Sequence, residues 1–304
     1  MKNNKICRGC GSKKTIRLFK KLNICQKCLL VFSEYNKSEQ KKIKSNIAKS
    51  ITYDFFKDSF NQFSSTKEFI NEGIIKKGKI IKEGNFNKIL KYTNFNKKDV
   101  ILDFGSGFGP FLEAMKKDYK IIGLEPNKDS YNFSKKLGHK VINKYINEYL
   151  FKPKMFKLIF SRTVLTYVLD LKKTFNLFYK FLKDDGYLML YLHQYKFSRY
   201  IHSPEYLENI SRAKQANIFS DESIKNLLLL NNFNLIYMNS NINATFIIAK
   251  KSIKKNYKNK KKLYGNVKFE IFYLKYLLII ISKILNLFFY IKVKLVNIIK
   301  AIMK

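Results

Sequence analysis

The sequence has no tryptophan and only three histidines, four prolines and 12 glycines in 304 residues, and five of its 60 basic residues are arginine. This scarcity argues against sequence-specific reading of RNA, because arginine is the side chain best suited to bidentate contacts with phosphate and guanine. The basic residues are dispersed, and asparagine, isoleucine, phenylalanine and tyrosine are abundant. That bias is typical of an AT-rich coding sequence. The formal charge of +38 therefore predicts nonspecific attraction to polyanions and no specific nucleic-acid partner.

All four cysteines lie near the N-terminus, in two C-x-x-C pairs separated by 14 residues: Cys7, Cys10, Cys25 and Cys28. This spacing is typical of a tetrahedral zinc site, in which each pair forms a turn on one side of the metal. Gly11 favours the first turn, whereas Leu29 follows the second pair. Two disulfides or a redox pair are the alternatives, but no signal peptide precedes the cysteines, so an oxidising compartment is not expected. The sequence predicts a structural Zn²⁺ site.

The most informative segment is VILDFGSGFGPFLEAM (100–115), which predicts a strand, a glycine-rich turn and a helix. An acidic residue, Asp103, stands two positions before G-x-G-x-G. Glycines at 105, 107 and 109 would let the backbone approach a nucleoside without an intervening Cβ.

The spacing differs from the dinucleotide-binding fingerprint, because position 110 is proline and the third glycine is Gly109. Proline suits the first turn of a helix. About twenty residues later, KIIGLEPN (120–127) predicts a second strand ending in Glu125, at the distance where an acidic side chain binds ribose hydroxyls. The pattern favours S-adenosylmethionine as the ligand, with Asp103 at its amino-acid end and Glu125 at its ribose.

From Lys79 to Ala249 the sequence resembles the class I, Rossmann-like methyltransferases. The glycine-rich turn matches the first motif of that family, Glu125 the second, 155–171 the fourth strand and 182–193 the fifth. The resemblance implies a doubly wound α/β sheet and S-adenosyl-L-methionine as cofactor. The expected cofactor-binding residues are Asp103, Gly105, Ser106, Gly107, Gly109, Glu125, Pro126 and Ser161.

The catalytic group is less clearly marked. Many relatives that act on small molecules or glycans have a Glu-His pair after the fourth strand, where this chain has Thr166 and Tyr167. The candidates are His193, at the expected carboxyl end of the fifth strand, and Tyr195 close by; the alternative is that His193 only packs or is solvated. His139 lies in a turn with no supporting group and is expected to be structural. Methyl transfer is a direct displacement that depends largely on alignment, so an obvious base is not required.

A zinc ribbon ahead of a class I domain resembles two groups, the methyltransferases of surface-polysaccharide and sugar biosynthesis and some RNA base methyltransferases. The segment 216–239 favours the first, because a helix that starts at a Phe-Ser turn precedes a strand, as in glycan methyltransferases. Asn217 stands near a position where those relatives have histidine. The resemblance implies a sugar or glycan acceptor; RNA methylation and a catalytically silent binding protein of the same fold are the alternatives.

The C-terminal segment combines eight lysines in 250–262 with a largely apolar stretch, 267–304. If helical, that stretch would carry its polar residues on one narrow stripe, which is typical of a helix lying in a membrane interface. Docking on the protein's own domain or on a second subunit, as in a homodimer, is one alternative. A true membrane span is disfavoured by Lys283.

We therefore expect four parts: a zinc-ribbon-like segment (1–36), a helical lead-in packed over the cofactor cleft (37–96), the methyltransferase domain (97–250), and a polybasic linker with an amphipathic helix (251–304). The expected location is the cytoplasm, peripheral to the inner face of the membrane.

Overall fold

The computed structural model describes residues 5–19, 21–49, 65–193, 215–241, 244–253 and the single positions 283, 284 and 287. Part of the expected helical lead-in (50–64), the candidate Tyr195 and nearly all of the expected C-terminal helix lie outside these residues. No helix in the described part of the chain is both long and apolar enough to span a bilayer.

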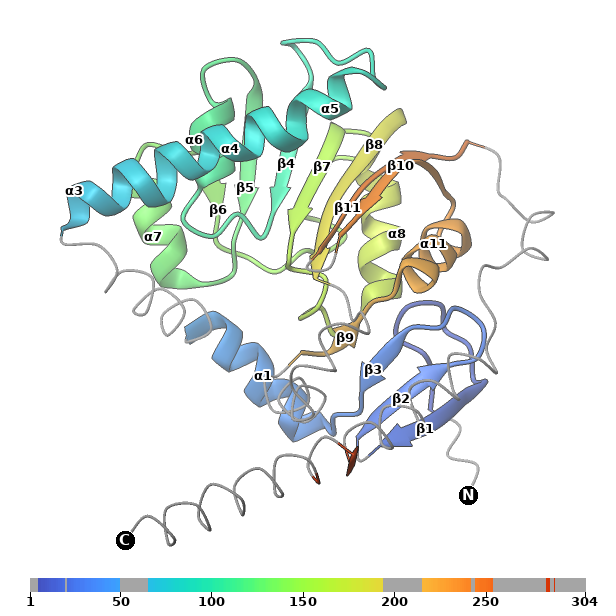
Figure 1. The fold of residues 1–304 in the computed structure, drawn as a ribbon. Coiled ribbons are helices and arrows are strands. Elements are labelled where there is room, and N and C mark those ends of the chain that lie inside the picture. Colours follow the sequence, from blue (N-terminus) through green and yellow to red (C-terminus); the bar gives the residue numbers. More distant parts are fainter. Residues whose placement is uncertain are drawn as a thin grey trace, which may run out of the picture.

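The centre of the fold is a seven-stranded sheet, counted over the described residues, with the order β10-β11-β8-β7-β4-β5-β6 (Figure 1). Strands β4 to β8 run parallel, and β11 is antiparallel to both β8 and β10. The strands are β4 (Val100–Phe104), β5 (Lys120–Leu124), β6 (Val141–Ile142), β7 (Phe156–Arg162), β8 (Leu182–His193), β10 (Phe233–Ser240) and β11 (Ala244–Lys251). The strands expected within 100–115 and 155–171 and at 182–193 are present as β4, β7 and β8, although β7 ends at Arg162; the strand expected to end in Glu125 is β5, which ends one residue earlier.

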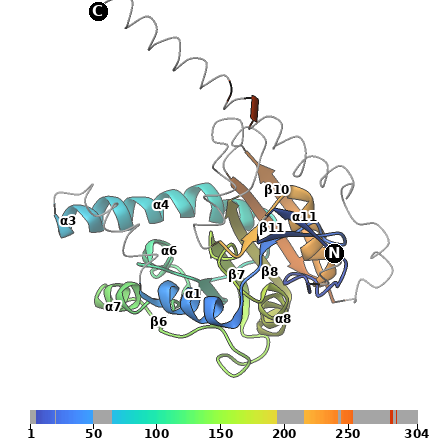
Figure 2. The same cartoon turned by 90° about the horizontal axis from the view of Figure 1, so that it is seen from below.

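Helices cover both faces of this sheet, as expected where parallel strands are buried on each side. One face packs against α8 (Leu171–Phe181) and α11 (Asp221–Leu230). The other packs against α6 (Pro110–Met115) and a continuous helical rod, Thr66–Leu90. The rod and α8 lie on opposite sides of the sheet in Figure 2. Each fully buried phenylalanine in these layers, such as Phe86, Phe160 and Phe178, contributes about 2 to 3 kcal/mol through apolar burial.

The rod alternates α-helical turns with wider π-helical turns: α3 (Thr66–Glu68), η1 (Phe69–Lys76), α4 (Lys77–Ile81), η2 (Lys82–Phe86) and α5 (Asn87–Leu90). Helix α7 (Lys128–Lys136) follows β5. The helices begin at polar caps, since Asn127, Asp170 and Ser220 accept backbone N–H groups at the starts of α7, α8 and α11.

The N-terminal segment forms a second, smaller sheet with the order β1-β2-β3-β9, from β1 (Thr15–Phe19), β2 (Leu22–Cys25), β3 (Val31–Ser33) and β9 (Asn217–Ile218). Helix α1 (Lys37–Lys49) follows it. Figure 1 shows α1, β9 and this ribbon beyond the carboxyl ends of the parallel strands. Since Leu30 and Phe32 share a buried cluster with α8 and α11, the ribbon is packed into the main body.

Candidate functional site

The glycine-rich turn after β4 has the backbone that its sequence predicts. Gly105, Gly107 and Gly109 all have positive φ, at 76°, 55° and 87°, a region that L side chains rarely adopt. Gly109 leads into α6, and Pro110 occupies its first turn, where a missing N–H costs nothing.

The three glycines serve different purposes, which corrects the expectation that each leaves room for a ligand. A Cβ at Gly105 would collide with Val164, and one at Gly109 would collide with Ser134 and His139. Only at Gly107 would a Cβ enter open space. Two of the glycines are therefore required by packing within the protein, and Gly107 is the one at which a side chain would contact no other atom.

Two carboxyl groups lie beneath this turn. Glu125 is 7 % exposed and accepts the N–H groups of Gly107 and Asn127, both at 2.8 Å. Burial raises the pKa of Glu125, opposed by those two hydrogen bonds. Asp103 is 3 % exposed; burial and then the nearby Glu125 hold its pKa well above the usual range, against the attraction of Arg162. A ligand carrying positive charge would complement this buried pair.

A cavity of about 420 Å³ opens beside the turn, on the α8 side of the sheet. Of the eight expected cofactor-binding residues, Gly105 and Pro126 line it directly. The other six do not line it, and four of them, Asp103, Ser106, Glu125 and Ser161, are buried. Sequence reasoning missed the rest of the wall, which includes Ile146, Val164 and Tyr167. Their place in the sequence could have identified them, because Val164 and Tyr167 directly follow β7 at the carboxyl edge where ligands of open α/β sheets bind.

The residues present fit S-adenosylmethionine. The cavity has the size of a small-molecule pocket and is mostly apolar, as an adenine ring requires. Gly107 leaves open space at the turn, and the buried Ser106 and Ser161 hydroxyls have no hydrogen-bond partner within the described residues. The acidic Asp103 and Glu125 match a ligand with a sulfonium, an ammonium group and ribose hydroxyls.

His193, the expected base, is the last residue of β8 and pairs in register with Ala244 of β11, at the carboxyl edge of the sheet. Its neighbour Tyr195 lies outside the described residues. Tyr167 lines the cavity, and burial raises the pKa of its phenol. The catalytic assignments of His193 and Tyr195 remain predictions.

His139 is structural, but the expectation that it lacks a supporting group is wrong. Its side chain is fully buried, with Nδ1 2.9 Å from Ser134 Oγ and Nε2 2.8 Å from Glu113 Oε2. The order Ser-His-Glu resembles a hydrolytic triad, yet Ser134 is 0 % exposed and cannot meet a substrate. The trio instead ties α6 to α7 beneath Gly109.

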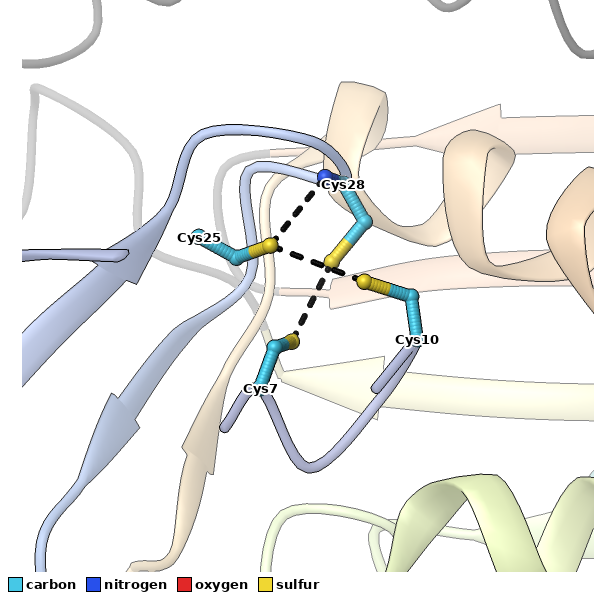
Figure 3. Close-up of side chains that lie close together, drawn as sticks. All are labelled: Cys7, Cys10, Cys25 and Cys28. Atoms are coloured by element: carbon cyan, nitrogen blue, oxygen red, sulfur yellow. Dashed lines mark hydrogen bonds between the residues drawn. The ribbon is translucent and has the colours of Figure 1, made fainter. Parts of the chain in front are cut away.

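The four cysteines converge on one point (Figure 3), and their Sγ atoms all lie within 4.8 Å of one another. Cys7 Sγ is 3.5 Å from Cys28 Sγ, and Cys10 Sγ is 3.6 Å from Cys25 Sγ, so the sulfurs contact one another without a disulfide. Hydrogen bonding with Cys10 lowers the pKa of the Cys25 thiol and raises that of Cys7. Four cysteine sulfurs at this spacing form a donor set of the kind that tetrahedral Zn²⁺ prefers.

Both cysteine turns have the same backbone. The N–H of the residue after each pair, Gly11 or Leu29, donates to the carbonyl of the first cysteine at 2.9 Å. Both residues have positive φ, 74° for Gly11 and 63° for Leu29. Leu29 thus adopts the conformation for which the first turn uses glycine, at a cost of about 1 to 2 kcal/mol. Such matched turns at both pairs are consistent with a metal held between them.

The ribbon reaches the cavity wall through one short segment. Strand β3 pairs with β9, with Val31 opposite Ile218. The backbone N–H groups of Ala216 and Asn217 donate to the carbonyl of Thr166, and the Asn217 amide donates to Leu165 and Val168 carbonyls at 2.9 and 2.6 Å. The loop after β7, which walls the cavity, is therefore held by the segment that extends the ribbon.

A seven-stranded α/β sheet with a glycine-rich turn after β4, an acidic residue after β5 and an antiparallel β11 defines a class I S-adenosylmethionine-dependent methyltransferase fold. Residues 79–237, just over half of the chain, match the family described as a methyltransferase domain, and the chain belongs to this family. The expected fold class and cofactor class are confirmed at this level.

The chain is similar to solved structures at low sequence identity. A SAM-dependent methyltransferase from Methanosarcina mazei is 20 % identical, with a TM-score of 0.47, over 54 % of this chain and 98 % of that one. A methyltransferase from Mesorhizobium loti is 13 % identical, with a TM-score of 0.44, over 55 % and 97 %. Geranyl diphosphate C-methyltransferase from Streptomyces coelicolor is 15 % identical, with a TM-score of 0.44, over 54 % and 78 %. No curated protein matches the sequence.

Proposed function

We propose that this methyltransferase acts on a sugar or glycan precursor at a membrane surface, and that Zn²⁺ bound by the four cysteines stabilises its ribbon. The proposed acceptor class is supported by two sequence features that the structure holds in direct contact. A C-x-x-C-G…C-x-x-C ribbon pairs through β3 with β9, directly ahead of the Phe219-Ser220 turn that begins α11. This is the combination by which the sequence resembles methyltransferases of surface-polysaccharide and sugar biosynthesis.

In this proposal S-adenosylmethionine supplies an electrophilic methyl group on a sulfonium. The residues of the chain would bind and orient it: Glu125, whose two oxygens accept the N–H groups of Gly107 and Asn127, would hold the ribose hydroxyls. The buried carboxyl of Asp103 would bind the ammonium. Apolar wall residues such as Val164 and Ile146 exclude water around the adenine. His193 or Tyr195 accepts the proton that the acceptor hydroxyl loses as its oxygen bonds to the methyl carbon.

Cofactor binding is tested by calorimetric titration with S-adenosylmethionine, comparing Gly107→Ala with Gly138→Ala. Both glycines have positive φ and open space around a new Cβ, but Gly107 belongs to the same turn as the cavity-lining Gly105, whereas Gly138 lies in the turn after α7. Each variant should lose about 1 to 2 kcal/mol of stability from backbone strain. Only Gly107→Ala should also lose cofactor affinity, by tenfold or more; equal affinities in the two variants would contradict the assignment.

The acceptor is tested by following transfer of a labelled methyl group to nucleotide sugars and lipid-linked glycans in one series and to RNA in another. Transfer to a sugar acceptor supports the proposal. Transfer that follows added RNA favours the first alternative, and cofactor binding without transfer to any acceptor favours the silent binding protein.

A further inference from the structure

Three lysines line the cavity beside the glycine-rich turn and lie where it opens to solvent. Lys44 belongs to α1, Lys144 to the segment that follows β6, and Lys173 to the first turn of α8. All three residues are exposed, and a residue that both lines a cavity and is exposed stands at its opening. The mouth of the cavity is therefore bordered by lysines from three different elements.

Hydrogen bonds fix the backbone that carries the first two lysines. The Tyr145 hydroxyl donates to the carbonyl of Lys44 at 2.9 Å, which joins α1 to the segment after β6 at the cavity. One residue before Lys144, the Asn143 amide donates to the carbonyl of Pro126 at 3.0 Å and ties this segment to the end of β5. Both lysines therefore extend from backbone that is held in place.

The mouth carries more positive than negative charge. Among the described residues that line the cavity, Asp170 is the one carboxylate, and its Oδ1 already accepts the N–H of Lys173 at 2.9 Å as the cap of α8. None of the three lysines forms an ion pair in the described part of the chain, whereas Lys154 pairs with Asp184 at 2.6 Å. Several cations around one opening attract an anion and raise its local concentration.

The same opening has a rigid apolar surface. The Tyr145 ring lines the cavity, is 46 % exposed and is fixed through its hydroxyl. An aromatic ring held in one orientation is suited to pack against the uncharged part of a ligand. In the proposed reaction the acceptor must meet the methyl group of a cofactor bound in this cavity, so it approaches beside this ring and the lysines.

We propose that Lys44, Lys144 and Lys173 bind a diphosphate group of the methyl acceptor at the mouth of the cavity. Lysine ammonium groups bind phosphate as point charges, and three of them from separate elements can contact several oxygens of a diphosphate at once. Among sugar and glycan acceptors, this site selects those carried on a diphosphate, linked either to a nucleoside or to a lipid. The site rests on the proposed function, because it assumes that methyl transfer takes place in this cavity.

The test uses the zinc-loaded full chain, saturated with S-adenosylhomocysteine and titrated calorimetrically with inorganic pyrophosphate at physiological salt. The wild type is compared with a mouth variant that combines three substitutions, and with each of them singly: Lys44→Gln, Lys144→Gln and Lys173→Gln. A control variant lowers the net charge by the same amount, because it replaces by glutamine three exposed lysines that do not line the cavity: Lys97, Lys98 and Lys117. Thermal unfolding establishes that each variant is folded.

The wild type and the control variant should bind pyrophosphate alike, and the mouth variant roughly 30-fold more weakly, with a smaller loss in each single variant. Equal losses in the control and mouth variants, or wild-type affinity in the mouth variant, would overturn the site. A wild type that binds S-adenosylmethionine but not pyrophosphate would overturn it too and leave the proposed function standing. If the wild type binds no S-adenosylmethionine, the proposed function fails, and the pyrophosphate titrations still decide the site.

The two sources of the diphosphate are separated by titrating the same proteins with uridine diphosphate, thymidine diphosphate and farnesyl diphosphate. Tighter binding of a nucleoside diphosphate assigns the site to nucleotide-linked sugars, and tighter binding of farnesyl diphosphate assigns it to lipid-linked glycans. Either preference must be accompanied by weaker binding in the mouth variant. A diphosphate that binds the mouth variant as tightly as the wild type is held elsewhere, which would overturn the site.

Discussion

Burial of the Asp103 carboxyl destabilises the ligand-free protein. Its pKa is raised on folding, by burial first and by Glu125 second, so the folded state takes up a proton that the unfolded chain releases. The sign follows from linkage: stability falls as pH rises above the ordinary aspartate value, because the native state binds more protons there. A positively charged ligand would relieve this cost by favouring the ionised carboxylate.

We expect Asp103→Asn to raise the thermal stability of the ligand-free protein and to lower its affinity for S-adenosylmethionine by about 10- to 100-fold, the value of a charge-assisted hydrogen bond. Wild-type affinity should increase with pH as the carboxyl ionises, and the asparagine variant should show a flatter profile. Thermal unfolding and calorimetry over pH 5 to 8 measure both. A variant that loses stability and binding together would indicate a structural role only.

His139 predicts a pH dependence of a different origin. Burial lowers its pKa, so the unfolded chain binds a proton more readily than the native state, and stability declines as pH falls below the ordinary histidine value. His139→Gln should flatten this decline between pH 7.5 and 5.5, and it should cost about 1 to 3 kcal/mol at pH 7.5 because Ser134 and Glu113 lose a shared partner. Urea unfolding at the two pH values measures both effects. If the stability of the variant falls with pH as steeply as that of the wild type, a group other than His139 causes the pH dependence.

At the scale of secondary-structure elements, the ribbon supports the loop after β7 that forms part of the cavity wall. Asn217 links the two, since its backbone continues the ribbon sheet through β9 and its side chain donates to carbonyls in the loop after β7. Removing the proposed Zn²⁺ should loosen this loop, because the ribbon's cysteines belong to the same buried cluster as α8 and α11.

We expect chelation of zinc, or Cys10→Ser, to lower the melting temperature and to weaken S-adenosylmethionine binding. Asn217→Ala should weaken binding while zinc content stays at one ion per chain, because the cysteines are untouched. Metal analysis with calorimetry on the three samples checks this. Unchanged cofactor affinity in the metal-free protein would show that the ribbon is independent of the pocket.

The elements differ in how far the sequence predicts them. Strands β4 and β8 contain short apolar runs, 100–102 and 187–192, next to turn residues, so their positions follow from local pattern, whereas β7 ends at Arg162, well inside the stretch 155–171 expected for it. The pairing of β3 with β9 does not, because a two-residue strand has no periodicity and its partner is far away in sequence. The cofactor motif can likewise be predicted because it is local in sequence. The cavity wall from Val164 to Tyr167 is a loop without a motif, and only the fold shows its role.

At the scale of the whole molecule, the 22 acidic residues are few beside 60 basic ones, and several acids are committed to ion pairs. Asp184 contacts both Lys154 and Lys251, and Asp185 contacts Lys157. Most lysines therefore remain available to solvent and to polyanions. The question that matters for function is whether attraction to a membrane is a property of net charge or of the cluster at 250–262.

Two variants of the full chain with the same net charge separate these cases. One replaces six clustered lysines by glutamine: Lys254, Lys255, Lys258, Lys260, Lys261 and Lys262. The other replaces six exposed lysines of the catalytic body: Lys91, Lys97, Lys98, Lys117, Lys128 and Lys136.

Each lysine close to an anionic surface is worth about 1 kcal/mol. If the C-terminal segment lies on the membrane, the first variant should lose at least 100-fold in sedimentation with phosphatidylglycerol vesicles, and the second should lose far less. Neutral phosphatidylcholine vesicles and high salt should reduce wild-type binding, because the attraction is screened. Cofactor affinity should be equal in both variants, since neither changes the cavity. Equal losses of vesicle binding would assign it to net charge, and the membrane role of 250–304 would then be wrong.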